Sequence, residues 1–181
     1  HAALLCDAGD GASNTVGGGA GIDFSVDNFY SAIYQLQSSA VPNGSIAAVL
    51  AEHSFNEFQA SLRSEGGAVA YQPSGAVEML RIKGQGYVGS FAGVDIWKSS
   101  YVNVATGTAR NLMFDTNGAF GYKYGDVIAP PMSPIINAGM GLAVEFERLG
   151  TQAMTESIGH GYLGYALLED ARVVEITTDD V

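Results

Sequence analysis

Residues 25–51 read SVDNFYSAIYQLQSSAVPNGSIAAVLA and place an amphipathic helix directly before a short apolar run. Ser25 is a suitable N-cap, because its side-chain oxygen can accept a hydrogen bond from the first turn. Pro42-Asn43-Gly44 ends the unit as a turn. Residues 45–51 (SIAAVLA) are short and almost entirely apolar, which favours a buried strand. The helical face is formed by apolar residues at three- and four-residue spacing, namely Val26, Phe29, Tyr30, Ile33 and Leu36.

A second helix is expected shortly afterwards. Ser54-Phe55-Asn56-Glu57 fits a capping box, which predicts that this helix begins at Ser54. Its buried face comprises Phe55, Phe58 and Leu62, and Glu65-Gly66-Gly67 ends it. A further short helix is expected over residues 76–83.

The rest of the chain is dominated by strand signals. Asn117-Gly118 predicts a hairpin between residues 112–114 and 120–124. Residues 141–149 (GLAVEFERL) alternate, which predicts a strand with Leu142, Val144 and Phe146 buried and with Glu145 and Glu147 on a solvated face. Residues 173–178 (VVEITT) read as a last strand. Helices grouped early and strands grouped late indicate an α+β fold.

The charge balance argues against nucleic-acid recognition. The chain has 19 Asp and Glu against 8 Lys and Arg, a net charge of −11, and its only lysines, Lys83, Lys98 and Lys123, are scattered. A phosphate-binding surface normally gathers basic residues on one face. One cysteine, Cys6, excludes an intrachain disulfide and a Cys metal cluster. No apolar run reaches the roughly 18 residues of a membrane span, so no membrane partner is expected.

Two segments match the G-x-G-x-x-G pattern of dinucleotide sites. Residues 84–89 (GQGYVG) lie between an expected helix and an expected strand, the reverse of the order that such a site needs. Residues 159–164 (GHGYLG) are the better candidate, because Asp179 follows at a suitable distance. However, the preceding QAMTES is polar, unlike a central parallel strand, and there is too little chain for a crossover helix. Both segments are therefore expected to be backbone turns without a ligand.

No other pattern supports catalysis or metal binding. Asp115-Thr116-Asn117-Gly118 resembles an aspartic-protease loop, but Asn117 interrupts the motif and a second loop is missing. His53 and His160 lack partners at zinc-ligand spacing. Glu145 and Glu147 are explained by a solvated strand face rather than by a catalytic pair. The sequence thus predicts no catalytic, cofactor-binding or metal-binding residue, no cofactor and no enzymatic activity.

Several segments, taken in order, carry a resemblance. They are residues 26–37 (VDNFYSAIYQLQ), 62–67 (LRSEGG), 83–96 (KGQGYVGSFAGVDI), 144–148 (VEFER) and 164–176 (GYALLEDARVVEI). In this order the chain resembles the major capsid proteins of tailed bacteriophages. The most characteristic parts are GSFAGVDI and LLEDARVVEI, and the resemblance covers nearly the whole chain.

The resemblance implies an α+β shell subunit with two regions. Residues 21–137 would form an axial region, to which residues 172–181 return as a C-terminal strand. Residues 138–171 would form a peripheral region, together with residues 1–20 as the end of a spine helix and a linker. The family's N-terminal arm, its extended loop and most of its spine helix have no counterpart here, so we expect this chain to be part of a longer protein.

The resemblance also implies what such a subunit does. It would assemble in the host cytoplasm into pentamers and hexamers of an icosahedral capsid, which encloses the DNA genome without sequence-specific binding. Other virion proteins, such as the portal or decoration proteins, would be further partners. Segments at the capsomer edge would gain burial from neighbouring subunits. Ion pairs across the subunit boundaries are expected from Glu145, Glu147, Arg148, Glu169, Asp170 and Arg172.

Two alternatives remain open at this point. One is an encapsulin-like bacterial nanocompartment, which has the same fold but encloses a cargo protein. The other is a nucleotide-binding enzyme that uses residues 159–164.

The first prediction separates the shell from the enzyme. If residues 84–89 and 159–164 are backbone segments only, the purified protein will not bind NAD or a nucleotide with micromolar affinity. Isothermal titration calorimetry measures this directly, and a saturating heat signal at micromolar ligand would contradict the prediction.

Overall fold

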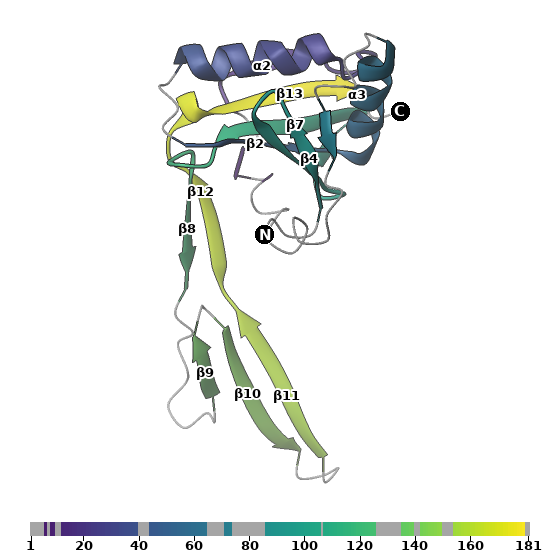
Figure 1. Ribbon diagram of the computed structural model, residues 1–181. Coiled ribbons are helices and arrows are strands. Elements are labelled where there is room, and N and C mark those ends of the chain that lie inside the picture. Colours follow the sequence, from purple (N-terminus) through teal and green to yellow (C-terminus); the bar gives the residue numbers. More distant parts are fainter. Residues whose placement is uncertain are drawn as a thin grey trace. The chain divides into compact units, whose positions relative to one another are not determined.

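The computed structural model describes residues 6, 8–9, 12–39, 44–64, 71–73, 86–105, 107–125, 135–139, 142–149 and 154–179 (Figure 1). It separates into two compact units. The first unit is His1–Gly121 with Ala166–Val181, and the second unit is Tyr122–Tyr165. Helices and several sheets occur together, which confirms the α+β fold.

The first unit contains a mixed eight-stranded sheet in the order β1-β13-β7-β2-β5-β4-β3, with β6 paired to β7. β13 pairs with β1 and β2 pairs with β5 in parallel, whereas the other pairs are antiparallel. The predicted strands over residues 45–51 and 173–178 are confirmed as β2 and β13. The strands are β1 (Thr15–Gly17), β2 (Ile46–Leu50), β3 (Tyr71–Pro73), β4 (Tyr87–Phe91), β5 (Val94–Lys98), β6 (Asn103–Ala105), β7 (Thr108–Asp115) and β13 (Val173–Asp179).

Two helices pack against this sheet, α2 (Val26–Ser39) and α3 (Glu52–Ser64), and Figure 1 shows α2 running alongside β13. The predicted N-cap of α2 is confirmed, because the Asn28 backbone N–H donates to Ser25 Oγ over 3.2 Å. The predicted helical face is buried at Val26, Phe29, Ile33 and Leu36, but the prediction is wrong at Tyr30, which is 48% exposed.

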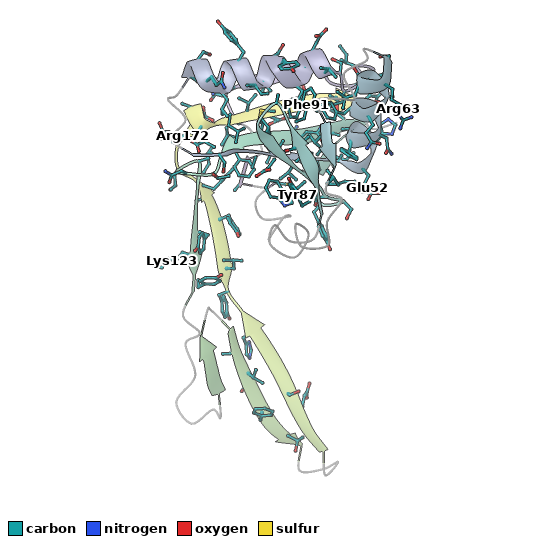
Figure 2. All side chains as sticks on the ribbon, viewed as in Figure 1. Glu52, Arg63, Tyr87, Phe91, Lys123 and Arg172 are labelled. Atoms are coloured by element: carbon teal, nitrogen blue, oxygen red, sulfur yellow. The ribbon has the colours of Figure 1, made fainter. Side chains whose placement is uncertain are left out.

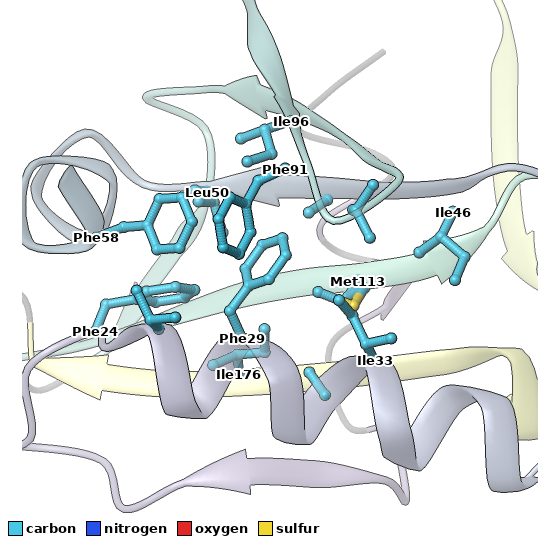
Figure 3. Packing of buried hydrophobic residues seen from close by; sticks show 14 of the residues in the cluster. Phe24, Phe29, Ile33, Ile46, Leu50, Phe58, Phe91, Ile96, Met113 and Ile176 are labelled. Atoms are coloured by element: carbon cyan, nitrogen blue, oxygen red, sulfur yellow. The ribbon is translucent and has the colours of Figure 1, made fainter. Parts of the chain in front are cut away.

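An aromatic cluster joins the helices to the sheet (Figure 3). Phe29 of α2 stacks on Phe58 of α3 with ring centroids 5.0 Å apart. Phe91 of β4 meets both rings edge-on, at 5.6 Å from Phe29 and 5.3 Å from Phe58. Phe24 closes the cluster at 5.8 Å from Phe58. Edge-to-face and offset contacts at these distances are the favourable geometries for aromatic rings, so the cluster stabilises beyond its buried area.

The start of α3 differs from the prediction. The helix begins at Glu52, and Ser54 is fully buried within it rather than capping it. Ser54 Oγ accepts a hydrogen bond from Asn111 Nδ2 over 3.0 Å and lies 3.1 Å from Thr178 Oγ1. Asn111 Oδ1 in turn accepts from the Ala51 N–H over 2.7 Å. The Ser54 hydroxyl is thus used by a buried polar network, which a local capping pattern does not reveal. The burial of Phe55, Phe58 and Leu62 is confirmed.

The predicted hairpin at Asn117-Gly118 is wrong in its pairing. Gly118 does lie in a turn, with a φ of +105° that favours glycine. However, β7 is already paired with β13 on one side and with β2 on the other. The strand after the turn, β8 (Phe120–Tyr124), pairs instead with β12 (Leu163–Leu167) in a two-stranded sheet. The helix expected over residues 76–83 lies outside the described residues.

The second unit contains a three-stranded antiparallel sheet in the order β11-β10-β9, from β9 (Ile135–Gly139), β10 (Leu142–Leu149) and β11 (Met154–Gly161). The predicted strand over residues 141–149 is confirmed as β10. Its predicted burial is wrong at Phe146, which is 42% exposed, whereas Ala143 on the opposite face is only 1% exposed. Alternation correctly assigns residues to faces, but it does not say which face is covered.

The two glycine-rich segments, residues 84–89 and 159–164, differ in structure. In the first segment, Gly86 lies in a turn, with a φ of +89° and a carbonyl that accepts a hydrogen bond from the Lys98 N–H over 2.7 Å. Residues 87–89 belong to β4 instead of the predicted turn, and residues 84 and 85 lie outside the described residues. Residues 159–164 are not a glycine turn: Gly159–Gly161 end β11, Leu163 and Gly164 begin β12, and Tyr162 alone lies between the two strands. Within residues 154–179, which are described throughout, no α-helix follows these glycines. They therefore lack the helix N-terminus that would hold a pyrophosphate.

The aromatic cluster yields the second prediction. Phe58→Ala removes a ring that is fully buried among three others, and it should lower the free energy of unfolding by about 3–5 kcal/mol. Tyr34→Ala on α2, where the side chain is 74% exposed, should change it by less than about 0.5 kcal/mol. Urea denaturation of both variants is the measurement. If both variants lowered the free energy of unfolding equally, the aromatic cluster around Phe58 would not be the core of the first unit.

Candidate subunit interface

The six residues predicted at subunit boundaries fall into two groups. Glu169, Asp170 and Arg172 lie in the first unit, at the 3₁₀ turn η2 (Asp170–Arg172) directly before β13. The other three lie on β10 in the second unit; they are Glu145, Glu147 and Arg148.

Arg172 is the centre of the first group (Figure 2). Its Nη1 donates to Asp115 Oδ2 over 2.8 Å and to the Asn117 carbonyl over 3.2 Å. Its Nε donates to Glu169 Oε2 over 2.5 Å. The hydrogen bond that Arg172 donates to Glu169, and to a lesser degree the one that it donates to Asp115, raise the pKa of Arg172. Asp115 is only 1% exposed in its side chain, so the guanidinium compensates a buried carboxylate.

These contacts join the chain segment that leaves β7 to the segment that enters β13. The Leu168 N–H donates to the Ala119 carbonyl over 2.9 Å at the same place. Asp170 contributes differently, because its Oδ1 accepts from the Ser13 N–H over 2.9 Å, directly before β1. The first group therefore has intramolecular partners. Whether any of its members also pairs with a second copy stays a prediction.

The second group lines the three-stranded sheet. Glu145 Oε2 lies 3.1 Å from His160 Nε2 on β11, and both side chains are half-buried. Glu147 is directly opposite Glu156 in the β10–β11 register. Arg148 is opposite Thr155; the side chains of Glu147 and Arg148 lie outside the described residues.

The sequence did not reveal the ribbon formed by β8 and β12. The Gly125 N–H donates to the Tyr162 carbonyl over 3.0 Å, and this register places Tyr122 opposite Tyr165. The rings of these two tyrosines are 6.1 Å apart, and Tyr124 packs against Tyr122 at 5.7 Å. Burial, Tyr124 and Tyr122 raise the pKa of Tyr165, in that order of importance. The segment at residues 120–124, predicted as one arm of a hairpin, is confirmed as the strand β8, but its pairing partner lies far along the chain.

Features of other function classes are not found in the described part of the chain. No group of three or more His, Cys, Asp or Glu residues there is suited to a metal ion. No helix there has the length and apolar composition needed to cross a bilayer. His53 pairs with Glu57 within α3 over 3.0 Å. A hollow of about 560 Å³ on the sheet is lined by apolar residues such as Val49, Trp97 and Phe114 and by polar or charged ones such as Glu52, Lys98 and Thr116.

The Arg172 cluster yields the third prediction. Arg172→Met should lower the thermal unfolding midpoint, because it leaves the Asp115 carboxylate buried without its cation. Asp115→Leu combined with Arg172→Met should recover part of the loss, because no charge then remains to be compensated. Differential scanning fluorimetry of both variants gives the comparison. A double variant less stable than Arg172→Met alone would contradict this role for Arg172.

No family model matches the chain, and no curated protein does. Solved structures do match. A chain of the holo-SrpI encapsulin complex from Synechococcus elongatus PCC 7942 has a TM-score of 0.68 and 16% identity, covering 97% of this chain and 56% of that one. A chain from Mycobacterium phage Che8 has a TM-score of 0.58 and 21% identity, covering 97% of this chain and 55% of that one. A chain from the capsid of Ralstonia phage GP4 has a TM-score of 0.60 and 14% identity, covering 94% of this chain and 53% of that one.

The chain therefore spans just over half the length of these matched chains. The matches cover both units, because they extend over 94–97% of the residues. The expected fold is thereby confirmed: the chain has the fold of tailed-bacteriophage major capsid proteins, which an encapsulin shares.

Proposed function

We propose that this chain is a structural subunit of an icosahedral bacteriophage capsid. The observation that carries the proposal is the fold match over nearly the whole chain to shell-forming proteins. In this function the subunit acts by self-association rather than by catalysis. It assembles into pentamers and hexamers in the host cytoplasm and becomes part of the virion.

The second unit supports self-association. Its three-stranded sheet leaves Phe146 exposed, and the two-stranded β8–β12 ribbon leaves Tyr122 exposed. Isolated two-stranded sheets are marginally stable in water, and large exposed apolar groups are typical of contact surfaces. In the proposed shell, neighbouring copies bury these exposed aromatic side chains.

We propose that the subunit consists of an axial and a peripheral region. The axial region comprises residues 21–137 and the returning strand at residues 172–181, and the peripheral region comprises residues 138–171 with residues 1–20. The three-stranded sheet of the second unit falls mostly in the peripheral region, which supports this part of the division. β1 (Thr15–Gly17), by contrast, pairs with β13 in the first unit, which does not support placing residues 1–20 in the peripheral region. We propose that some of the six predicted boundary residues pair with a second copy; they are Glu145, Glu147, Arg148, Glu169, Asp170 and Arg172.

The charge of the chain fits an enclosing shell. With a net charge of −11, the subunit does not attract the DNA phosphates through its overall field. The genome is then enclosed without sequence-specific contacts. Portal and decoration proteins are further proposed partners, which bind the assembled shell.

A nanocompartment shell is the second candidate function. The observation in its favour is the TM-score of 0.68 to the encapsulin, which exceeds the scores of 0.58 and 0.60 to the two phage chains. Such a shell would hold a cargo protein instead of a genome.

The fourth prediction decides between these functions. The expressed protein should form uniform icosahedral particles in negative-stain electron microscopy. Particles from infected cells that contain DNA, measured by the ratio of absorbance at the nucleic-acid and protein maxima, would support the capsid. Small particles filled with a co-purifying protein would support the nanocompartment. A monomer that forms no particles at any concentration would contradict both.

A further inference from the structure

We infer that one face of the β8–β12 ribbon is a docking site for an acidic segment of a second copy of this chain. This face is defined by Lys123, Gly125, Tyr162 and Gly164. The inference rests on the proposed shell function and specifies one contact within it. All four residues belong to the second unit.

The ribbon register places these residues on one face. The Gly125 N–H donates to the Tyr162 carbonyl, and the Leu168 N–H donates to the Ala119 carbonyl, so the two strands are antiparallel. In this register Lys123 is opposite Gly164, and both are on the face opposite to Tyr122. Tyr162 is opposite Gly125, where an added Cβ would lie 2.9 Å from the Tyr162 Cβ. Glycine at position 125 therefore leaves room for the Tyr162 side chain on this face.

This face is hollow and open. A hollow of about 460 Å³ is lined by Lys123, Gly125, Gly161, Tyr162, Leu163 and Gly164. A Cβ added at Gly164 would meet no atom within 4 Å. Tyr162 is 54% exposed. A floor of glycines beside an exposed tyrosine admits the backbone of another chain at close range, and tyrosine is among the residues enriched at protein interfaces.

Lys123 gives the site its charge preference. It lies on β8 (Figure 2) and is exposed, and it forms no ion pair with any carboxylate among the described residues. Lys98, Arg110 and Arg172, in contrast, each pair with a carboxylate of their own chain. A lysine without an ion-pair partner in the described part of the chain, beside a hollow, is complementary to an incoming Asp or Glu.

A second copy is the occupant that the charges favour. The chain carries 19 acidic against 8 basic residues, so the surface of a neighbouring copy is rich in carboxylates. DNA is disfavoured, because phosphate binding needs several clustered basic residues and this face has only Lys123. A shell also brings copies together at high local concentration, so that a modest contact sets the register between subunits.

The test uses two variants that alter the site by different means. Lys123→Glu reverses the charge. Gly164→Val fills the hollow without changing the charge, and the open space around the added side chain together with the strand backbone allows it to fold. Arg63→Glu is the matched control, because Arg63 is also exposed and without a described carboxylate partner, but lies on α3 in the first unit.

Assembly of the purified protein is followed by light scattering against protein concentration. Both site variants should raise the concentration at which particles form by about tenfold or more, whereas Arg63→Glu should leave it unchanged. Circular dichroism of the dissociated subunits verifies that each variant is folded. Particles that form as in the wild type from both site variants would overturn the inference alone. A loss of equal size in Arg63→Glu would also overturn it, because net charge would then explain the result. A wild-type protein that forms no particles would contradict the proposed function, and with it this inference.

A second measurement keeps the inference testable if a variant fails to fold. A photo-crosslinking amino acid is placed at position 162, and particles are assembled from mixed isotope-labelled and unlabelled copies. Mass spectrometry should find crosslinks between copies, in a peptide that contains Asp or Glu. Crosslinks only within one copy, or only to nucleic acid, would overturn the inference.

Discussion

The antiparallel pairing of β7 with β13 is the interaction on which the rest of the first unit depends. It runs without a break from Val173↔Phe114 to Asp179↔Thr108 and lies inside the sheet, between β1 and β2. β7 ends at Asp115 and β13 begins at Val173, so this pairing closes a long loop whose conformational entropy opposes folding. Burial on both strands compensates for that cost, because Leu112, Met113, Val173, Val174 and Ile176 are all almost inaccessible.

Several other features follow from this pairing. α2 packs on β13, and the Phe29 ring thereby reaches Phe58 and Phe91. Asn111 of β7 and Thr178 of β13 hold the Ser54 hydroxyl of α3. At the point where the loop closes, Arg172 binds Asp115. The end of β7 and the start of β13 are therefore held together by both an ion pair and a strand pair. This allows the first unit to complete its own hydrophobic core.

The sequence predicted what local patterns determine. Helical spacing identified α2, and alternation identified β10 and the faces on which its residues lie. Prediction from the sequence failed where contacts between residues far apart in the chain overrode a local pattern. Asn117-Gly118 has the composition of a hairpin turn, yet both edges of β7 are taken by strands distant in sequence. Ser54 fits a capping box, yet Asn111 binds it in the interior. The β8–β12 ribbon was missed for the same reason, since its register depends on residues far apart in the sequence.

Phe146 shows a different limit of prediction from the sequence, because it concerns burial at the candidate interface. Alternation along β10 placed it correctly on one face with Val144, but no pattern in a single chain says whether another copy covers that face. We propose that the first unit carries its own core, whereas β10 and the ribbon are completed by neighbouring subunits. Hydrogen exchange compared between dissociated subunits and assembled particles tests this division most directly. We expect the amides of β7 and β13 to be protected equally in both states, and those of β10 and β12 to gain protection when particles form. Equal protection of β10 and β12 in the two states would contradict the division.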